Sequence, residues 1–282
     1  LVAAIKPQPI IIDSIKKKEM QRHPGPPFIT STLQQDAARR LRFSAQKTMM
    51  IAQQLYEGLE LDDEGGTGLI TYMRTDSTRI AEEAINGVRS YISDKYGKEY
   101  VPGRPRVFKT KASAQDAHEA IRPTSAELVP DEIKKNLTPD QAKLYELIWC
   151  RFVASQMKSA VFDVTTVEAK SGDHLFRATG STPRFAGFLK VYGEVADEDA
   201  EQEDNSSIPP LSENEELSLE ELTPKQHFTQ PPPRYTEATL VKELEAKSIG
   251  RPSTYAQIIS TLRMRKYVTI KRGRFMPTDL GE

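Results

Sequence analysis

The stretch Gly68-Leu69-Ile70-Thr71-Tyr72-Met73-Arg74-Thr75-Asp76-Ser77-Thr78 decides how this chain is organised. Two apolar residues lead into a tyrosine, and an arginine follows two positions later. Hydroxyl groups then surround a single carboxylate. Apolar side chains recur at helical spacing over residues 80–92, which predicts a helix directly after this loop.

Tyr72 and Arg74 have the chemistry of a nucleophile and of a group that assists it. Because the pKa of a phenol is about 10, a tyrosine is a poor nucleophile at neutral pH without help. A nearby cation can stabilise a phenolate, or the negative oxygens of a phosphodiester under attack. A tyrosine beside an arginine is also typical of packing or of a surface ion pair, so other segments must decide between these interpretations.

Length and composition limit the class of protein. The 282 residues are enough for one large domain or for roughly two to three small ones. No apolar run is long enough to predict a membrane-spanning helix. The single cysteine, Cys150, excludes an intrachain disulfide and a cysteine-based zinc site, which fits a reducing compartment.

The net charge of −1 hides an uneven distribution. Residues 191–224 contain twelve acidic residues and no lysine or arginine, so the rest of the chain sums to +11. The acidic part, 194–221, is predicted to be a mobile loop. The basic remainder is compatible with nucleic acid as a partner, although a solvated basic surface is the alternative.

The segment from Ser113 to Thr124 has the signals of a short helix. Ser113 and Asp116 have capping-box spacing, and a proline near the end would stop the helix. On such a helix His118 and Arg122 stand four residues apart and share a face. An imidazole beside a guanidinium favours phosphate contact, and a structural histidine is the alternative.

Other segments show regular periodicities. Apolar residues at helical spacing follow potential N-caps, and the helix after Ser44 carries Tyr56 on its apolar side. Alternating patterns predict strands. The expected N-caps are Thr32, Ser44, Thr138 and Thr236, and the expected strands lie in residues 1–20, 161–167, 174–179 and 188–191.

Residues 235–275 follow the order helix, turn, helix and basic β-hairpin, which is the order of a winged helix. The hairpin tip is Lys271-Arg272-Gly273, and Arg263, Arg265 and Lys266 lie at the end of the second helix. These cations favour contact with a DNA backbone. Winged helices also serve as protein-interaction modules, which is the alternative.

Four motifs together resemble those of type IA DNA topoisomerases, most closely the bacterial topoisomerase I branch, and they occur in that family's order. Methionine at position 73 matches this branch, because topoisomerase III relatives typically carry proline there. The motifs are Phe28-Ile-Thr-Ser-Thr-Leu-Gln-Gln35, Ile70-Thr-Tyr72-Met-Arg74-Thr-Asp76-Ser77, Ala117-His118-Glu119-Ala-Ile-Arg122-Pro123 and Ile249-Gly-Arg251-Pro-Ser253-Thr254-Tyr255.

The resemblance implies a multidomain α+β fold that forms part of an open ring. Residues 1–27 would form the first segment of a β arch, and residues 159–233 its second segment with the acidic loop. Residues 28–158 would form a helical domain that carries the tyrosine. Residues 234–282 would form a winged-helix-like, DNA-binding part of the base.

The resemblance makes Tyr72 the nucleophile that joins to the 5′-phosphate of a single DNA strand and releases a 3′-hydroxyl. Arg74 and His118 would complete the catalytic set. A tyrosyl phosphodiester retains the energy of the broken bond, so resealing needs no ATP, and negatively supercoiled DNA would be relaxed. The DNA-binding residues would be Asp76, Ser77, Arg122, Arg251, Ser253, Thr254 and Arg265.

One departure concerns the metal. The family's Toprim domain supplies a glutamate and an Asp-x-Asp site for Mg²⁺, and the chain lacks a matching strand-linked motif. Asp197-Glu198-Asp199 matches the Asp-x-Asp pattern but lies in the acidic loop, so no residue is assigned as a metal ligand. We therefore expect an internal piece of a longer polypeptide whose Toprim domain and Mg²⁺ site lie elsewhere.

This piece is expected to bind DNA without relaxing it, and its expected location is the cytoplasm, in association with the nucleoid. Two alternatives remain open from the sequence. One is a non-catalytic winged-helix module that binds single-stranded or duplex DNA. The other is the topoisomerase half of a reverse gyrase, which would need a helicase domain upstream.

Overall fold

The computed structural model describes residues 5, 8–60, 66–109, 118–193 and 208–282. The chain mixes helices with open sheets and forms two compact units. The sheet unit comprises Leu1–His23, Ser159–Gly187 and Ala196–Pro232. The helical unit comprises Pro24–Lys158, Phe188–Val195 and Pro233–Glu282. The four-part division expected from the sequence stays a prediction.

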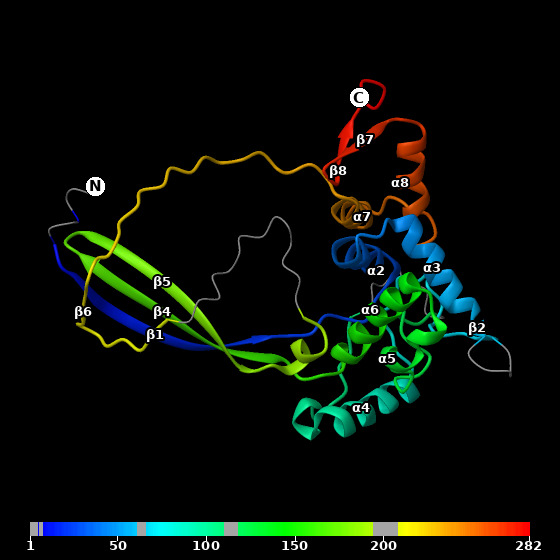
Figure 1. Cartoon of the computed structure of the whole chain (residues 1–282), viewed down its shortest axis with the longest axis horizontal. Helices are drawn as coiled ribbons and strands as arrows, with labels where there is room; N and C mark the ends of the chain where they lie inside the picture. The colour runs from blue at the N-terminus through cyan, green and yellow to red at the C-terminus, as the bar shows by residue number, and fades with distance from the viewer. Residues whose placement is uncertain (1–4, 6–7, 61–65, 110–117, 194–207) are drawn as a thin grey trace. The chain divides into compact units, whose positions relative to one another are not determined.

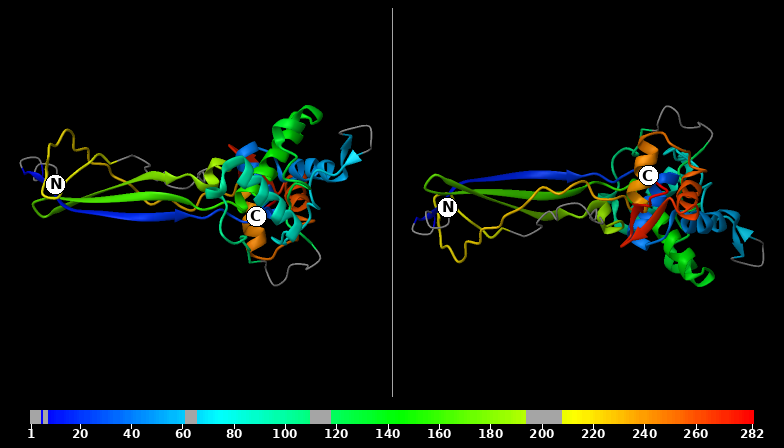
Figure 2. Two further views of the ribbon diagram at one scale, coloured as in Figure 1. Left: turned by 90° about the horizontal axis from the view of Figure 1, so that it is seen from below. Right: turned by 90° about the horizontal axis from the view of Figure 1, so that it is seen from above.

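The sheet unit is built on an antiparallel sheet with the order β5-β4-β1-β6. Its strands are β1 (Ile10–Arg22), β4 (Ala160–Ser171), β5 (His174–Phe185) and β6 (Glu216–Leu217). The three long strands lie side by side in every view (Figures 1 and 2). In β1, Ile10 and Ile12 are buried while Ile11 is exposed, because alternate side chains of a strand point to opposite faces.

The helical unit packs around α6, whose Leu144, Tyr145, Ile148 and Phe152 are buried. Its main elements are α2 (Thr30–Asp36), α3 (Ala45–Glu57), α4 (Glu82–Tyr96), α5 (Pro130–Ile133), α6 (Pro139–Ser155), α7 (Glu237–Ala246), α8 (Tyr255–Met264), β7 (Val268–Lys271) and β8 (Arg274–Pro277). Within the described residues, no helix is both long enough and apolar enough to cross a membrane.

Three of the predicted caps are confirmed. The Ser44 hydroxyl accepts from the Lys47 N–H at 3.2 Å, at the start of α3. Thr138 and Gln141 form a reciprocal capping box before α6. The Thr236 hydroxyl accepts from the backbone N–H three residues later, at the start of α7. These caps are predictable because every bond spans only three residues.

The prediction that Thr32 is an N-cap was wrong. Helix α2 begins at Thr30 with Ile29 as its N-cap, and the Thr32 hydroxyl accepts from the Ile29 N–H at 3.0 Å. The predicted strand at 188–191 was also wrong, since Gly187–Lys190 forms a 3₁₀ helix. There the Phe188 N–H donates to the Lys158 carbonyl at 3.0 Å instead of to a neighbouring strand.

The predicted order of helix, helix and hairpin near residue 282 is confirmed by α7, α8 and the pair β7–β8. Ala45 of α3 joins Val241, Ile259 and Phe275 in one apolar cluster, so this part packs on α3. At the hairpin tip Arg272 and Gly273 both have positive φ, which a tight two-residue turn requires.

Candidate active site

The tyrosine loop, residues 68–78, is not helical and bends at Thr71, Met73 and Arg74; from Tyr72 to Ser77 more buried residues alternate with more exposed ones. Met73 is fully buried and Thr75 is nearly so. Tyr72 is 38% exposed, and Arg74 is also exposed. Met73 is buried between Tyr72 and Arg74, so the chain is anchored there while the phenol and the guanidinium stay on the surface.

Thr30, the first residue of α2, holds one side of this loop. Its hydroxyl donates to the Met73 carbonyl at 2.7 Å and accepts from the Thr75 N–H at 2.9 Å. The Thr30 N–H also donates to the Thr75 carbonyl at 2.9 Å. Thr30 is completely buried, so no water competes for these bonds. Thr30 therefore holds the backbone on both sides of Arg74, at Met73 and at Thr75.

A second threonine holds the other side of Tyr72. The Thr71 N–H donates to the Arg122 carbonyl at 2.9 Å, and its hydroxyl donates to the Ala120 carbonyl at 2.6 Å. The Arg122 N–H in turn donates to the Thr71 hydroxyl at 3.0 Å. The segment 118–124 is thus attached to the tyrosine loop on the N-terminal side of Tyr72.

The predicted helix over Ser113–Thr124 is contradicted where the chain is described. Residues 118–124 are extended, and Ile121 and Pro123 form bridges with Phe28 and Ile70. Their backbone groups bond to neighbouring segments instead of to one another. His118 and Arg122 therefore do not share a helical face. The predicted capping box of Ser113 and Asp116 lies outside the described residues.

Two aromatic rings contact Tyr72. The His118 ring lies 5.7 Å from the Tyr72 ring, centroid to centroid, at an angle of 54°. The Tyr56 ring lies 5.4 Å away in an edge-to-face arrangement at 67°. Tyr56 belongs to the last turn of α3 and is missing from the predicted site, because helical spacing placed it among the core side chains of that helix.

Arg74 lines a groove of about 330 Å³ together with residues of α3 and α8. Gln46 and Met49 form one wall, and Ser253 lies beside the start of α8. Among the described residues, the Arg74 guanidinium has no hydrogen bond or ion pair. The groove therefore brings Arg74 from the second motif close to the exposed Ser253 hydroxyl from the fourth.

The turn before α8 contains the other residues of the fourth motif. The Thr254 hydroxyl accepts from the Arg251 N–H at 2.8 Å, so Thr254 stabilises the turn itself. The exposed Arg251 side chain donates to the Gly250 carbonyl at 2.7 Å. Arg265 is exposed at the C-terminal end of α8. Arg251 and Arg265 are thus open to an anionic ligand, while Thr254 has a local structural role.

Besides Thr254, three predicted DNA-binding residues are buried or half-buried, in positions that favour structural roles. Ser77 is only 2% exposed, and its hydroxyl accepts from the Arg79 N–H. Asp76 is half-buried. It lies close enough to Tyr255 for its charge to act on the Tyr255 hydroxyl. Burial is the main cause of the raised pKa of that hydroxyl, and the negative charge of Asp76 raises it further. Arg122 is the third.

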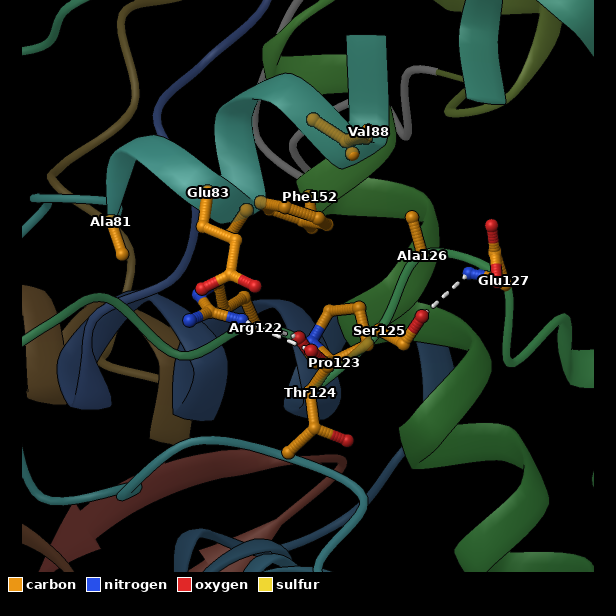
Figure 3. A pocket seen from close by; sticks show the side chains of 12 residues that line it. Ala81, Glu83, Val88, Arg122, Pro123, Thr124, Ser125, Ala126, Glu127 and Phe152 are labelled. Atoms are coloured by element: carbon orange, nitrogen blue, oxygen red, sulfur yellow. Dashed lines mark hydrogen bonds between the residues drawn. The ribbon is translucent and has the colours of Figure 1, made fainter. Parts of the chain in front are cut away.

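The Arg122 guanidinium is occupied by protein groups. Its Nε and Nη2 atoms lie 2.9 and 2.8 Å from one carboxylate oxygen of Glu119, and Nη1 donates to the Pro123 carbonyl at 2.9 Å. Figure 3 shows this side chain lining a cavity of about 380 Å³ with Glu83 of α4. Only 12% of the side chain is exposed.

In the described ranges, no group of three or more His, Cys, Asp or Glu side chains is placed to hold a metal ion. The acidic residues Asp197, Glu198 and Asp199 lie outside those ranges. The described residues therefore do not fit a magnesium site. The chemistry that they do offer is an exposed phenol between two rings, with a cation two residues away.

Known proteins resemble this chain along its whole length. A family model described as DNA topoisomerase matches residues 1–282. DNA topoisomerase 1 of Rickettsia bellii (strain RML369-C) is 51% identical over 284 residues, which cover 100% of this chain and 35% of that protein. DNA topoisomerase 1 of Rickettsia felis (strain ATCC VR-1525 / URRWXCal2) is 52% identical, with coverage of 100% and 36%.

A solved structure shows the same fold. Full-length topoisomerase I from Thermotoga maritima matches with a TM-score of 0.83 and 41% sequence identity. The match covers 98% of this chain and 44% of that one. The chain thus spans 35% and 36% of the length of the two curated relatives.

Proposed function

Because this chain belongs to the type IA DNA topoisomerase family, in its bacterial topoisomerase I branch, we propose that it carries the nucleophile with which the whole protein opens one strand of DNA. The observation that carries the proposal is the exposed Tyr72 ring, with His118 against it and, two residues away, Arg74, whose guanidinium has no bond to any other described residue. The activity belongs to the longer protein, of which such a chain is one part.

In the proposed reaction the Tyr72 Oη atom attacks the phosphorus of a phosphodiester. A new bond joins the tyrosine to the 5′-phosphate, and the bond from phosphorus to the 3′-oxygen breaks. The phenol loses one proton and the leaving oxygen gains one, so the protons balance. Arg74 would offset the negative charge of the phosphate, and His118 would help to position it. One phosphodiester replaces another, so resealing needs no ATP.

The groove that contains Arg74 and Ser253 is the proposed path of the single strand. Arg251 and Arg265 would add phosphate contacts, whose strength falls as salt rises. We propose that Asp76, Ser77, Arg122 and Thr254 support the loops that carry these contact residues. Passage of DNA through the opened strand would relax negatively supercoiled DNA in the whole protein.

We propose that Mg²⁺ and the Toprim domain belong to another part of the same polypeptide. The support is that the described residues offer no cluster that fits the ion. This chain alone would then bind DNA without relaxing it. Because DNA is the substrate, the place of action would be the cytoplasm, at the nucleoid.

The proposal is tested in the full-length protein with MgCl₂ and a 3′-labelled single-stranded oligonucleotide. Denaturation of a cleavage reaction should leave the label joined covalently to Tyr72, located by peptide mapping. Tyr72→Phe removes one oxygen and keeps the ring, so it should abolish the adduct while folding and DNA binding persist. An adduct on another residue would refute the assignment. A non-catalytic DNA-binding module would bind the oligonucleotide and form no adduct.

A further inference from the structure

The geometry around Tyr72 points to Tyr56 as a positioning residue, and we propose that its ring holds the Tyr72 ring in place for attack. This inference rests on the proposed function of Tyr72. The two centroids lie 5.4 Å apart at 67°, within the range in which aromatic pairs attract each other edge to face. Tyr56 is 39% exposed, so filling the core does not explain its position.

The backbone fixes Tyr56 relative to the tyrosine loop. The Leu69 N–H donates to the Leu55 carbonyl at 2.8 Å, which joins the start of the loop to the last turn of α3. The Tyr56 carbonyl lies so close to Gly68 that an added Cβ would come within 2.8 Å of it. Glycine is therefore needed at position 68 for the close approach. Tyr56 and Tyr72 are thus carried by two segments that cannot move independently.

The Tyr72 ring needs such a contact. In the part of the chain that the structure describes, its hydroxyl makes no hydrogen bond, so the phenol is free to meet a phosphate. Two rings, those of Tyr56 and His118, limit the torsions of the side chain instead. An edge-to-face contact of ordinary strength would favour the held rotamer by roughly 2- to 12-fold.

The inferred contact is made by the Tyr56 ring and does not require its hydroxyl. Among the described residues it has no hydrogen-bond partner. A phenylalanine at this position would keep the ring and its edge-to-face geometry, whereas a leucine would keep apolar bulk and lose the ring. The pair Tyr56→Phe and Tyr56→Leu therefore separates positioning by the ring from any role of the hydroxyl.

The test uses the full-length protein with MgCl₂ and a saturating 3′-labelled single-stranded oligonucleotide. The rate of covalent adduct formation in a single turnover, the oligonucleotide Kd and the stability to urea are measured for each variant. Tyr56→Phe should keep the wild-type rate. Tyr56→Leu should slow adduct formation roughly 2- to 12-fold with unchanged Kd and stability. Met50→Ala, on the same helix at a residue 55% exposed, is the control and should change nothing.

Equal rates for Tyr56→Leu and the wild type would overturn the inference. An equal loss in Tyr56→Phe would assign the effect to the hydroxyl and also refute it, as would a loss that follows Kd or stability. Failure of the proposed function gives a different result, because the wild-type protein itself would then form no adduct at Tyr72.

Discussion

Replacement of Thr30 by valine removes one hydroxyl and nearly preserves the shape of the side chain, so it tests how the tyrosine loop is held. That hydroxyl bonds to the Met73 carbonyl at 2.7 Å and to the Thr75 N–H at 2.9 Å, and Thr30 has no exposed surface. Valine would leave both backbone groups without this partner, in an interior that water does not reach. The bond from the Thr30 N–H to the Thr75 carbonyl would remain.

The expected cost follows from these contacts. An unsatisfied buried backbone group costs about 1–3 kcal/mol. Two groups in one short loop share any relaxation, so we expect Thr30→Val to lower the free energy of unfolding by about 2–4 kcal/mol. Thr30→Ser keeps the hydroxyl and removes one buried methyl group, which costs about 1 kcal/mol. The serine variant should therefore be the more stable of the two.

The assay is urea unfolding followed by tryptophan fluorescence. Trp149 is the single tryptophan, and it is 4% exposed in α6 of the helical unit, which also contains Thr30. Its indole N–H donates to the Ala126 carbonyl at 3.0 Å, so its emission should change when this unit unfolds. A valine variant as stable as the serine variant, or more stable, would refute the role given to the hydroxyl.

Two further predictions concern Arg122 and Cys150. Arg122→Ala should cost about 1.5–3 kcal/mol of unfolding free energy, and Arg122→Lys should recover only part, since lysine lacks the planar fork. Binding of single-stranded DNA should barely change, whereas a large loss of affinity at unchanged stability would make Arg122 a DNA contact. Burial raises the pKa of the Cys150 thiol to about 12. At pH 8 iodoacetamide should therefore alkylate the folded chain roughly 50-fold more slowly than the urea-unfolded chain, as measured by mass spectrometry; similar rates would contradict the raised pKa.

Features set by local bonds could be predicted from the sequence. Ser44, Thr138 and Thr236 each cap a helix through a bond that spans three residues. The tip Arg272-Gly273 supplies the two positive φ angles of its hairpin turn. The prediction that Tyr72 and His118 act in one site rests on motif resemblance instead, because no periodicity places these two rings 5.7 Å apart.

Features set by distant segments could not be predicted. Residues 113–124 carry helix signals, yet the described part is extended because Thr71 and Phe28 take its backbone bonds. The interpretation of Arg122 as a phosphate contact assumed that helix; in the segment held by Thr71 and Phe28, its guanidinium binds Glu119 instead. Helical spacing predicted that Tyr56 is a core side chain of its helix. Its contact with Tyr72 depends on the path of the tyrosine loop, which comes back to the end of α3 where Leu69 bonds to Leu55.

The pairing of β1 with β4 has a consequence for the order in which the chain folds during synthesis. Arg22 at the end of β1 lies opposite Ala160 at the start of β4, and the whole stretch Pro24–Lys158 is made between them. Until β4 has left the ribosome, the nascent β1 lacks the strand with which it pairs along its length. Its edge is then open, and Ile10 and Ile12, which are buried in the folded sheet, are exposed. Helices α2 to α6 contain their own local bonds and can form earlier. Closing so long a loop costs little additional entropy but slows folding, so we expect the sheet to be completed after the helices.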